Sequence, residues 1–214
     1  MRLYLSSYKF GNFAGKLAEL ASDNKKVCII MNALDFGDPE RIAMSVGNQV
    51  DTFKTLGYEA EQLDLRDFFN KKDELRNHIS KFGMVWVNGG NVFILKRAYE
   101  QSGFDTLIKE MLVKDDIVYA GYSAGVCVMC PTLHGSELVD NPNIVPEGYA
   151  PEFSWEGLGI FSKAISVHYK SDHPESADID KEIEYFKEHN IPFEVLRDGE
   201  VYFENGEVKE FLRI

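Results

Sequence analysis

Short apolar runs alternate with segments of helical spacing over the first 120 residues. The apolar runs predict buried strands at residues 2–5, 27–31, 60–65, 84–87 and 117–120. Between them, apolar positions recur at helical spacing in four groups: Phe13, Leu17, Leu20 and Ala21; Ile42, Val46, Val50 and Phe53; Phe93, Leu95, Ala98 and Tyr99; Leu107, Ile108, Met111 and Leu112. Strands that alternate with helices predict an α/β fold, whose mainly parallel sheet is covered on both faces.

The last third of the chain has a different pattern. Residues 141–160 are rich in Pro, Gly and turn formers, which predicts a long irregular connection of the kind that often lies over a site. "KAISVHY" alternates like a strand, and residues 175–189 have helical spacing behind Pro174. The tail predicts a β-meander, because Asp198-Gly199 and Asn205-Gly206 are strong hairpin-turn signals. The length of 214 residues suits one domain over residues 1–214.

Composition narrows the possible partners and compartments. The net charge of −12 argues against nucleic acid and anionic membranes as general partners. Cys28, Cys127 and Cys130 form no disulfide framework, and the Cys127/Cys130 pair follows a glycine turn into a presumed buried helix, so we expect structural thiols. The N-terminus lacks the apolar core of a signal peptide, and no apolar run reaches transmembrane length. We therefore expect a cytoplasmic protein.

The stretch "GYSAG", residues 121–125, joins an apolar run to a predicted helix. A serine between two glycines at such a corner matches the turn that raises a nucleophile above a sheet. The N–H groups and positive dipole end of the following helix would favour an oxyanion beside Ser123. The alternative interpretation is a tight packing turn that needs small residues.

A second glycine turn, Asn88-Gly89-Gly90-Asn91, also links an apolar run to a predicted helix. In parallel sheets such turns gather at the carboxyl edge, where ligands bind. Backbone N–H groups of this turn could donate to an oxyanion, and Asn91 could cap the helix.

A serine nucleophile needs a base and an acid that orients it. Among the five histidines, His168 ends the predicted strand "AISVHY", and a strand end is a rigid support beside the sheet edge. The carboxylates between Ser123 and His168 are Glu137, Asp140, Glu147, Glu152 and Glu156. Glu137 and Asp140 come soonest after the serine helix, and their spacing does not choose between them.

In this order and spacing, the stretches "VNGGNVFIL", "GYSAGVCVMCPT" and "ISVHY" resemble the peptidase E family of serine peptidases. The resemblance implies a class I glutamine amidotransferase-like fold, which is a three-layer, flavodoxin-like sandwich with a mainly parallel sheet. It implies Ser123 as nucleophile, His168 as base, and the N–H groups of Gly90 and Ala124 as the oxyanion hole. It implies neither a metal nor an organic cofactor.

The sequence departs from the family pattern in two places. Family dipeptidases have an aspartate in the loop after the serine helix, where this chain has Leu138 at the gapless position; we expect Glu137 as the triad acid, with Asp140 as the fallback. They also have an arginine in the stretch after the histidine, and "KSDHPESADIDKE" has none. Lys170 or His173 could supply positive charge to the substrate instead.

These observations together predict a serine peptidase that cleaves short peptides, in the manner of dipeptidase E, through a Ser–His–Glu triad. The substrate is expected to contact Asn91, Lys170 and His173, and residues 141–160 are expected to narrow the site. The alternatives are an esterase, amidase or cyanophycinase-like hydrolase of the same fold, and a small-ligand-binding protein without catalysis. We expect a monomer or homodimer.

Overall fold

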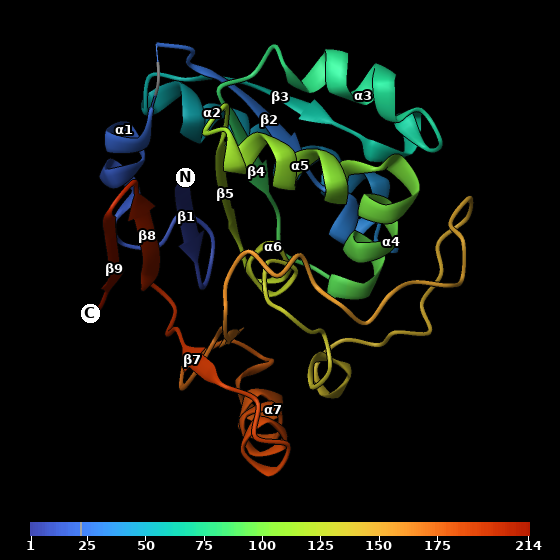
Figure 1. Cartoon of the computed structure of the whole chain (residues 1–214), viewed down its shortest axis with the longest axis vertical. Helices are drawn as coiled ribbons and strands as arrows, with labels where there is room; N and C mark the ends of the chain where they lie inside the picture. The colour runs from blue at the N-terminus through green and yellow to red at the C-terminus, as the bar shows by residue number, and fades with distance from the viewer. Residues whose placement is uncertain (22) are drawn as a thin grey trace.

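A seven-stranded sheet forms the centre of the computed structural model, which describes residues 1–21 and 23–214 (Figure 1). The strand order is β3-β2-β4-β5-β1-β8-β9, in which the first five strands are parallel and the last two antiparallel. These strands are β1 (Arg2–Ser6), β2 (Lys26–Ile30), β3 (Glu59–Leu63), β4 (Met84–Val87), β5 (Val118–Tyr122), β8 (Val201–Asn205) and β9 (Val208–Leu212). The mainly parallel sheet is confirmed, and each of the five predicted runs lies on a strand.

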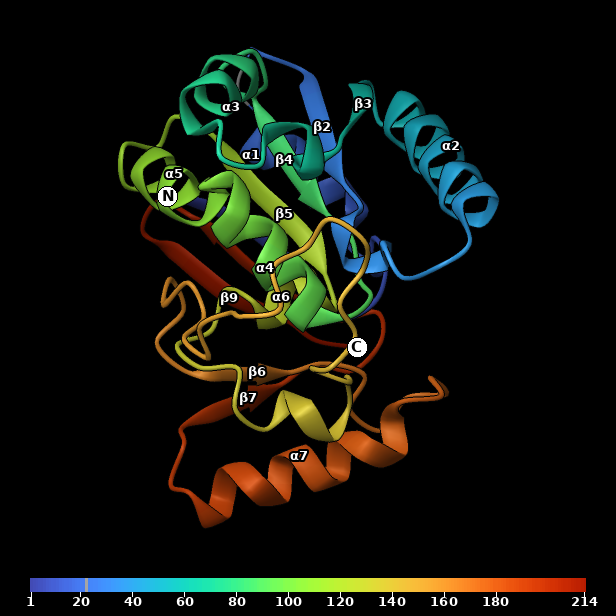
Figure 2. The ribbon, with the colours of Figure 1, turned by 90° about the vertical axis from the view of Figure 1, so that its right-hand side faces the viewer.

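Helices cover both faces of this sheet, so its inner strands are apolar at consecutive positions. In β4, Val85 and Val87 join one core cluster, while Trp86 joins the other on the opposite face. The first cluster includes residues of α3, α4 and α5, and the second includes residues of α1 and α2. Figure 2 shows α2 apart from α3, α4 and α5. The helices are α1 (Leu17–Leu20), α2 (Pro39–Thr55), α3 (Lys72–Ile79), α4 (Val92–Ser102), α5 (Phe104–Val113), α6 (Ala124–Cys127) and α7 (Ser176–Glu188).

Local signals set several of these helix ends. Asp38 caps α2 by accepting from the Arg41 N–H, and Pro39 takes the first helical position. Gly103 separates α4 from α5 in a left-handed conformation with φ of 74°. The helix predicted around residues 13–21 is shorter than expected, because the turn at Ala14–Lys16 is a 3₁₀ helix and only Leu17–Leu20 is α-helical.

The last third of the chain forms a separate small unit beside the sheet. Strand β6 (Ala164–Ser166) pairs in parallel with β7 (Phe193–Val195), and α7 joins them at the lower end of the molecule (Figures 1 and 2). The prediction that the whole tail forms one β-meander is therefore wrong, because β7 belongs to the small sheet. Strands β8 and β9 form the expected hairpin around Asn205-Gly206, whereas Asp198-Gly199 links β7 of the small sheet to β8 of the main sheet.

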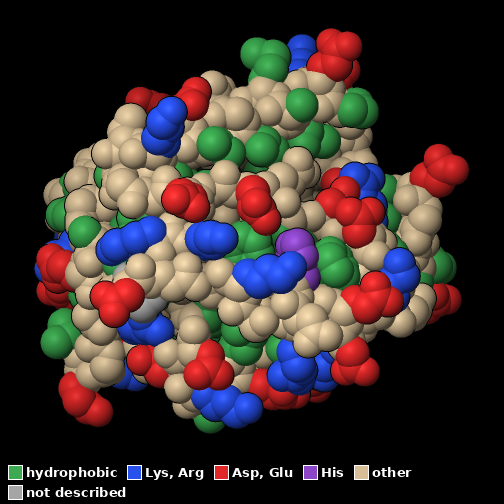
Figure 3. Space-filling view, turned by 90° about the horizontal axis from the view of Figure 1, so that it is seen from above, with side chains coloured by type: hydrophobic (Ala, Val, Ile, Leu, Met, Phe, Trp, Pro, Cys, Tyr) green, Lys and Arg blue, Asp and Glu red, His purple; other side chains and the backbone are tan. Residues whose placement is uncertain are grey.

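Residues 141–160 are irregular as predicted, and within the described chain their backbone forms no helix and only one isolated bridge, Thr132 to Glu156. The three cysteines are free, and Cys28 and Cys130 are buried, as expected for structural thiols. In the described residues, no helix is both long and apolar enough to cross a membrane. On the face shown in Figure 3, acidic and basic side chains lie intermixed.

Candidate active site

Ser123 lies at the corner between β5 and α6, in a backbone conformation that side chains rarely adopt. Its φ is 49° and its ψ is −117°. A non-glycine residue held at positive φ costs on the order of 1–3 kcal/mol, and such strain persists where the surrounding structure fixes it. The half-buried serine is thus held at the carboxyl end of a central strand, as the G-x-S-x-G pattern predicts.

Both glycines of this pattern are required by packing against one carbonyl group. A Cβ atom on Gly121 or on Gly125 would lie 2.6 Å from the carbonyl oxygen of Val87 in the neighbouring strand. That distance is below any normal contact, so no larger residue fits at either position without movement of the backbone. The packing explanation and the catalytic explanation of "GYSAG" therefore both hold: the glycines are needed for packing, and they position Ser123.

The second glycine turn lies directly against the serine. A Cβ on Gly89 would come within 2.9 Å of the Ser123 Cβ, and one on Gly90, whose φ is 136°, within 2.5 Å of the Ala33 carbonyl oxygen. The N–H groups of Gly90 and Ala124 donate no hydrogen bond to another part of the described chain. Two unused N–H donors on the two turns beside Ser123 are suited to an oxyanion.

His168 follows β6 and is completely buried, with φ of 57°. Its Nδ1 lies 2.7 Å from Oδ1 of Asp198, while its Nε2 has no hydrogen-bond partner among the described residues. Burial lowers the pKa of His168, which the nearby Asp198 charge partly opposes and the nearby His173 reinforces. A neutral imidazole with a free Nε2 is therefore available as a base.

Asp198 occupies the position that we expected Glu137 or Asp140 to take, so this part of the sequence-based hypothesis is corrected. Glu137 accepts from the Gly135 N–H at 2.6 Å, within its own turn. Asp140 accepts from the Val92 N–H at the start of α4, and burial raises the pKa of Asp140 to about 7. Neither carboxylate forms a hydrogen bond or ion pair with His168.

Parallel pairing in the small sheet explains why Asp198 reaches His168. Ser166 at the end of β6 is in register with Val195 at the end of β7, so the residues that follow each strand emerge at the same end. The sequence pattern indicates an acid between Ser123 and His168 and assigns Asp198 to a turn. The signal that would have found it is a carboxylate shortly after a second strand with the same direction as "AISVHY".

Ser7, which follows β1, connects this unit to the main sheet and was not predicted. Its hydroxyl accepts from the His168 N–H at 2.8 Å and lies 2.9 Å from Asp198 Oδ1 as a donor. One buried side chain at the carboxyl edge of the main sheet thus fixes both the backbone of the histidine and the carboxylate beside it.

Of the residues expected to contact the substrate, His173 lines the pocket of Ser123 and Asn91 does not. His173 lies in the pocket that Ser123 and His168 line, which has a volume of about 320 Å³. Asn91 instead uses its side chain to cap α4, accepting from Phe93 and Ile94 N–H and donating to the Asn141 carbonyl.

Two further expectations are corrected by burial and packing. Lys170 is exposed, lies over the Tyr169 ring and does not line the pocket. Residues 141–160 contribute nothing to the pocket lining either. They pack against α4, where Arg97 donates to the Pro142 and Pro151 carbonyls.

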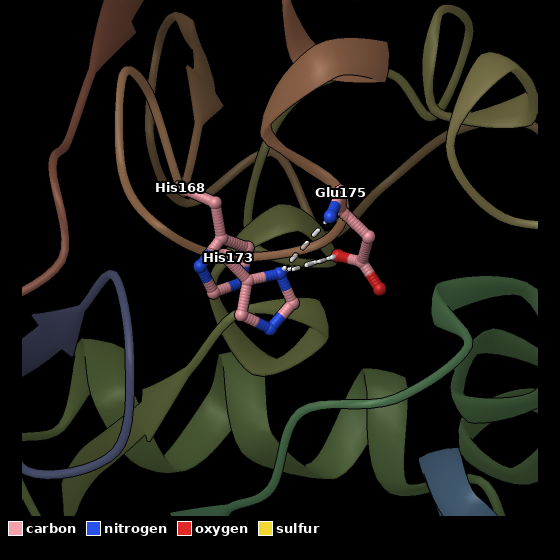
Figure 4. Close-up of side chains that lie close together, drawn as sticks. All are labelled: His168, His173 and Glu175. Carbon is pink, nitrogen blue, oxygen red and sulfur yellow. Dashed lines mark hydrogen bonds and ion pairs between the residues drawn. The ribbon is translucent and has the colours of Figure 1, made fainter.

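Figure 4 shows how His173 lies against His168. Their ring centroids are 3.8 Å apart with an interplanar angle of 11°, and Glu175 Oε2 is 3.7 Å from His173 Nδ1. These three residues are metal-ligand types with ligand atoms within 4.8 Å of one another. The stacked rings direct their nitrogen lone pairs along nearly parallel planes, whereas a tetrahedral zinc site needs them to converge. In this arrangement the His173 ring covers the His168 imidazole, and the cluster does not have the geometry of a zinc site.

A smaller pocket that also contains Ser123 is lined by acidic residues. Asp140, Glu175 and Glu182 all contribute to its lining, together with Ser123 itself. Burial also raises the pKa of Glu182 to about 7, and its carboxylate accepts from the hydroxyls of Ser136 and Ser166. Ser123 and Glu175 thus line both this small pocket and the larger one.

Comparison with known proteins places this chain in a described family. The sequence profile of Peptidase family S51 matches residues 6–210. A protein named Peptidase E from Salmonella arizonae is 32% identical over 97 residues, which are 45% of this chain and 38% of that protein. A candidate alpha-aspartyl dipeptidase of Drosophila melanogaster is 27% identical over 155 residues, which are 70% of this chain and 58% of that protein. This chain therefore aligns with less than two thirds of either relative.

A solved structure confirms the fold. The crystal structure of a candidate peptidase E protein from Listeria monocytogenes superposes with a TM-score of 0.80 at 21% identity, covering 100% of this chain and 98% of that one. A peptidase from an acI-B1 actinobacterium gives a TM-score of 0.60 at 17% identity, covering 99% and 93%.

Proposed function

The chain belongs to Peptidase family S51, and on that basis we propose that it is a serine peptidase of short peptides, with Ser123 as nucleophile, His168 as base and Asp198 as orienting acid. One observation carries the proposal. His168 bonds Asp198 through Nδ1, its Nε2 has no hydrogen-bond partner among the described residues and lies 4.0 Å from Glu175 Oε2, and His168 lines the same pocket as Ser123. A Ser–His–Asp arrangement replaces the Ser–His–Glu arrangement expected from the sequence.

The proposed reaction passes through an acyl-enzyme. Ser123 Oγ attacks the peptide carbonyl carbon while its proton moves to His168 Nε2, and Asp198 stabilises the imidazolium. The tetrahedral oxyanion accepts from the Gly90 and Ala124 N–H groups. The intermediate collapses as His168 returns the proton to the leaving amine. Water, deprotonated by His168, then attacks the acyl carbonyl. The second tetrahedral intermediate collapses as His168 returns this proton to Ser123 Oγ, which releases the acid product.

Ser123 Oγ and His168 Nε2 are not hydrogen-bonded in this structure, since Nε2 has no partner among the described residues. Catalytic hydrogen bonds are often long without substrate and shorten in the Michaelis complex. The geometry supports the pair because both side chains line the same pocket.

The substrate class follows from the family and from the names of the relatives. We propose dipeptides and similarly short peptides, including those with an N-terminal aspartate. The stretch after His168 contains no arginine, so any preference for aspartate rests on other cations. We further propose a cytoplasmic protein that acts as a monomer or homodimer.

Two measurements test this function. Ser123→Ala should lower peptide hydrolysis by at least about 10⁴-fold without changing the thermal melting temperature, whereas the exposed Ser80→Ala should leave activity unchanged. A fluorophosphonate probe should form an adduct on Ser123, found by mass spectrometry. Cleavage of simple esters but of no dipeptide in a panel would favour an esterase. An unlabelled Ser123 would favour a binding protein.

A further inference from the structure

A second cavity, of about 400 Å³, lies beside the pocket of Ser123. We name it the α2 pocket, because most of its lining comes from α2; the rest comes from the loop after β1 and from the end of β5. Its lining residues are Lys9, Phe10, Arg41, Met44, Ser45, Asn48, Gln49, Thr52 and Tyr122. Lys9, Ser45 and Tyr122 also line the Ser123 pocket, so the two cavities adjoin.

The charged residues of the α2 pocket are both cations. Lys9 and Arg41 are exposed, and neither forms an ion pair with another described residue. This is unusual in a chain of net charge −12, whose acidic residues outnumber its basic ones by 35 to 23. The small pocket that also contains Ser123 is lined by three carboxyl groups, of Asp140, Glu175 and Glu182. Burial raises the pKa of Asp140 and Glu182 to about 7, so we take Glu175, which lines both this pocket and the Ser123 pocket, as the acidic group that faces the substrate.

Apolar groups complete the α2 pocket. Phe10 stacks on Trp86, with ring centroids 4.3 Å apart, and its carbonyl oxygen accepts from the buried Tyr4 hydroxyl at 2.6 Å. Met44 of α2 is 68% exposed and lines the same pocket. A fixed aromatic wall and a flexible thioether in one pocket suit an apolar side chain of variable shape.

From these features we infer that the α2 pocket binds the residue on the leaving-group side of the scissile bond, with its free carboxylate at Lys9 and Arg41 and its apolar side chain between Phe10 and Met44. The inference rests on the proposed peptidase function. A short peptide then lies with its ammonium end toward Glu175 and its carboxylate toward α2. The cleft thereby selects peptides that end one or two residues beyond the cut.

A hydrogen-bonded wall connects the α2 pocket to the oxyanion turn. Asn88 Oδ1 accepts from Gln49 Nε2 and from the Tyr122 hydroxyl, both at 2.8 Å. The Asn88 amide in turn donates to the Gly89 carbonyl. A residue bound in the α2 pocket therefore packs against the same network that holds the glycine turn beside Ser123.

Calorimetric titration tests the inference without any need for turnover. In the Ser123→Ala background, the peptide Ala-Leu should bind about 10- to 100-fold more tightly than its C-terminal amide, because the amide loses its charge-assisted hydrogen bonds. With Lys9→Met and Arg41→Gln added, this ratio should fall to within about threefold. Lys54→Gln, which removes an exposed charge from α2 outside the pocket, should leave the ratio unchanged.

Two outcomes overturn the inference. One is equal binding of acid and amide by Ser123→Ala, or a preference that survives the loss of Lys9 and Arg41. The other is that the double change abolishes discrimination between Asp-Leu and Asn-Leu instead, which would place the cations at the N-terminal side chain. Hydrolysis by the unmodified protein separately decides the proposed function, so a peptidase without carboxylate selectivity and a binding protein with it are distinguishable.

Discussion

Replacing Asp198 with Asn removes the negative charge beside His168 and keeps the size of the side chain. The two charges would stand 2.7 Å apart when His168 is protonated in the transition state. At an effective dielectric constant of about 20, unit charges at this distance attract by roughly 6 kcal/mol. Asp198 is 24% exposed, so part of this interaction is screened. We expect kcat/KM to fall by about 10³- to 10⁴-fold.

Glu137→Gln is the matched control, because sequence reasoning assigned the same role to that residue. Its carboxylate bonds only within its own turn and is 29% exposed, so kcat/KM should stay within about threefold of the unmodified enzyme. The assay is steady-state hydrolysis of one dipeptide by both variants, with melting temperatures to verify folding. A loss confined to Glu137→Gln, or a folded Asp198→Asn with near-normal activity, would refute the assignment.

Three other predictions concern packing and protonation. Gly125→Ala should lower the free energy of unfolding in urea by about 1–3 kcal/mol, because the added Cβ clashes with the Val87 carbonyl. Gly47→Ala should raise the free energy of unfolding by up to about 1 kcal/mol, because the space around its Cβ position is open. Equal effects of the two substitutions would contradict the packing argument. Burial raises the pKa of Glu182 to about 7, so the stability that its neutral carboxyl confers should be lost as pH rises from about 4.5 through 7, by roughly 3 kcal/mol. In chemical unfolding at several pH values, Glu182→Gln should remove this contribution and leave the similar one of Asp140. Because the pKa of His168 is lowered, the acidic limb of kcat/KM against pH should have its midpoint below about 6.5, and a midpoint above 7 would contradict a buried neutral base.

Much of the main sheet could be predicted because each inner strand is a short apolar run buried on two faces. The run at residues 84–87 coincides with β4, and Asn91 begins α4 with a capping side chain that a local pattern can indicate. The strands of the small sheet are only three residues long, which is too short for the period of the sequence to reveal their pairing. Their parallel partnership therefore could not be predicted.

The candidate site was predictable where it is local and not where it depends on pairing. Ser123 and Gly90 lie in turns whose glycines identify them, and His168 ends a recognisable strand. Asp198 comes 30 residues after His168 and looks like an ordinary turn residue, since Asp-Gly favours hairpins. Lys9 and Arg41 come together only because α2 packs beside the loop after β1, which no local pattern indicates.

The chain leaves the main sheet after β5 and returns to it only at β8. The segment between these two strands, called the excursion below, contains both His168 and Asp198. We therefore expect the proposed nucleophile and its two proposed partners to belong to regions with different resistance to unfolding. The seven-stranded sheet holds Ser123, while a pair of three-residue strands and the Ser7 hydroxyl hold the rest. Local opening of the excursion would separate base from nucleophile while the sheet stays intact. In such an enzyme, inactivation and denaturation are distinct events.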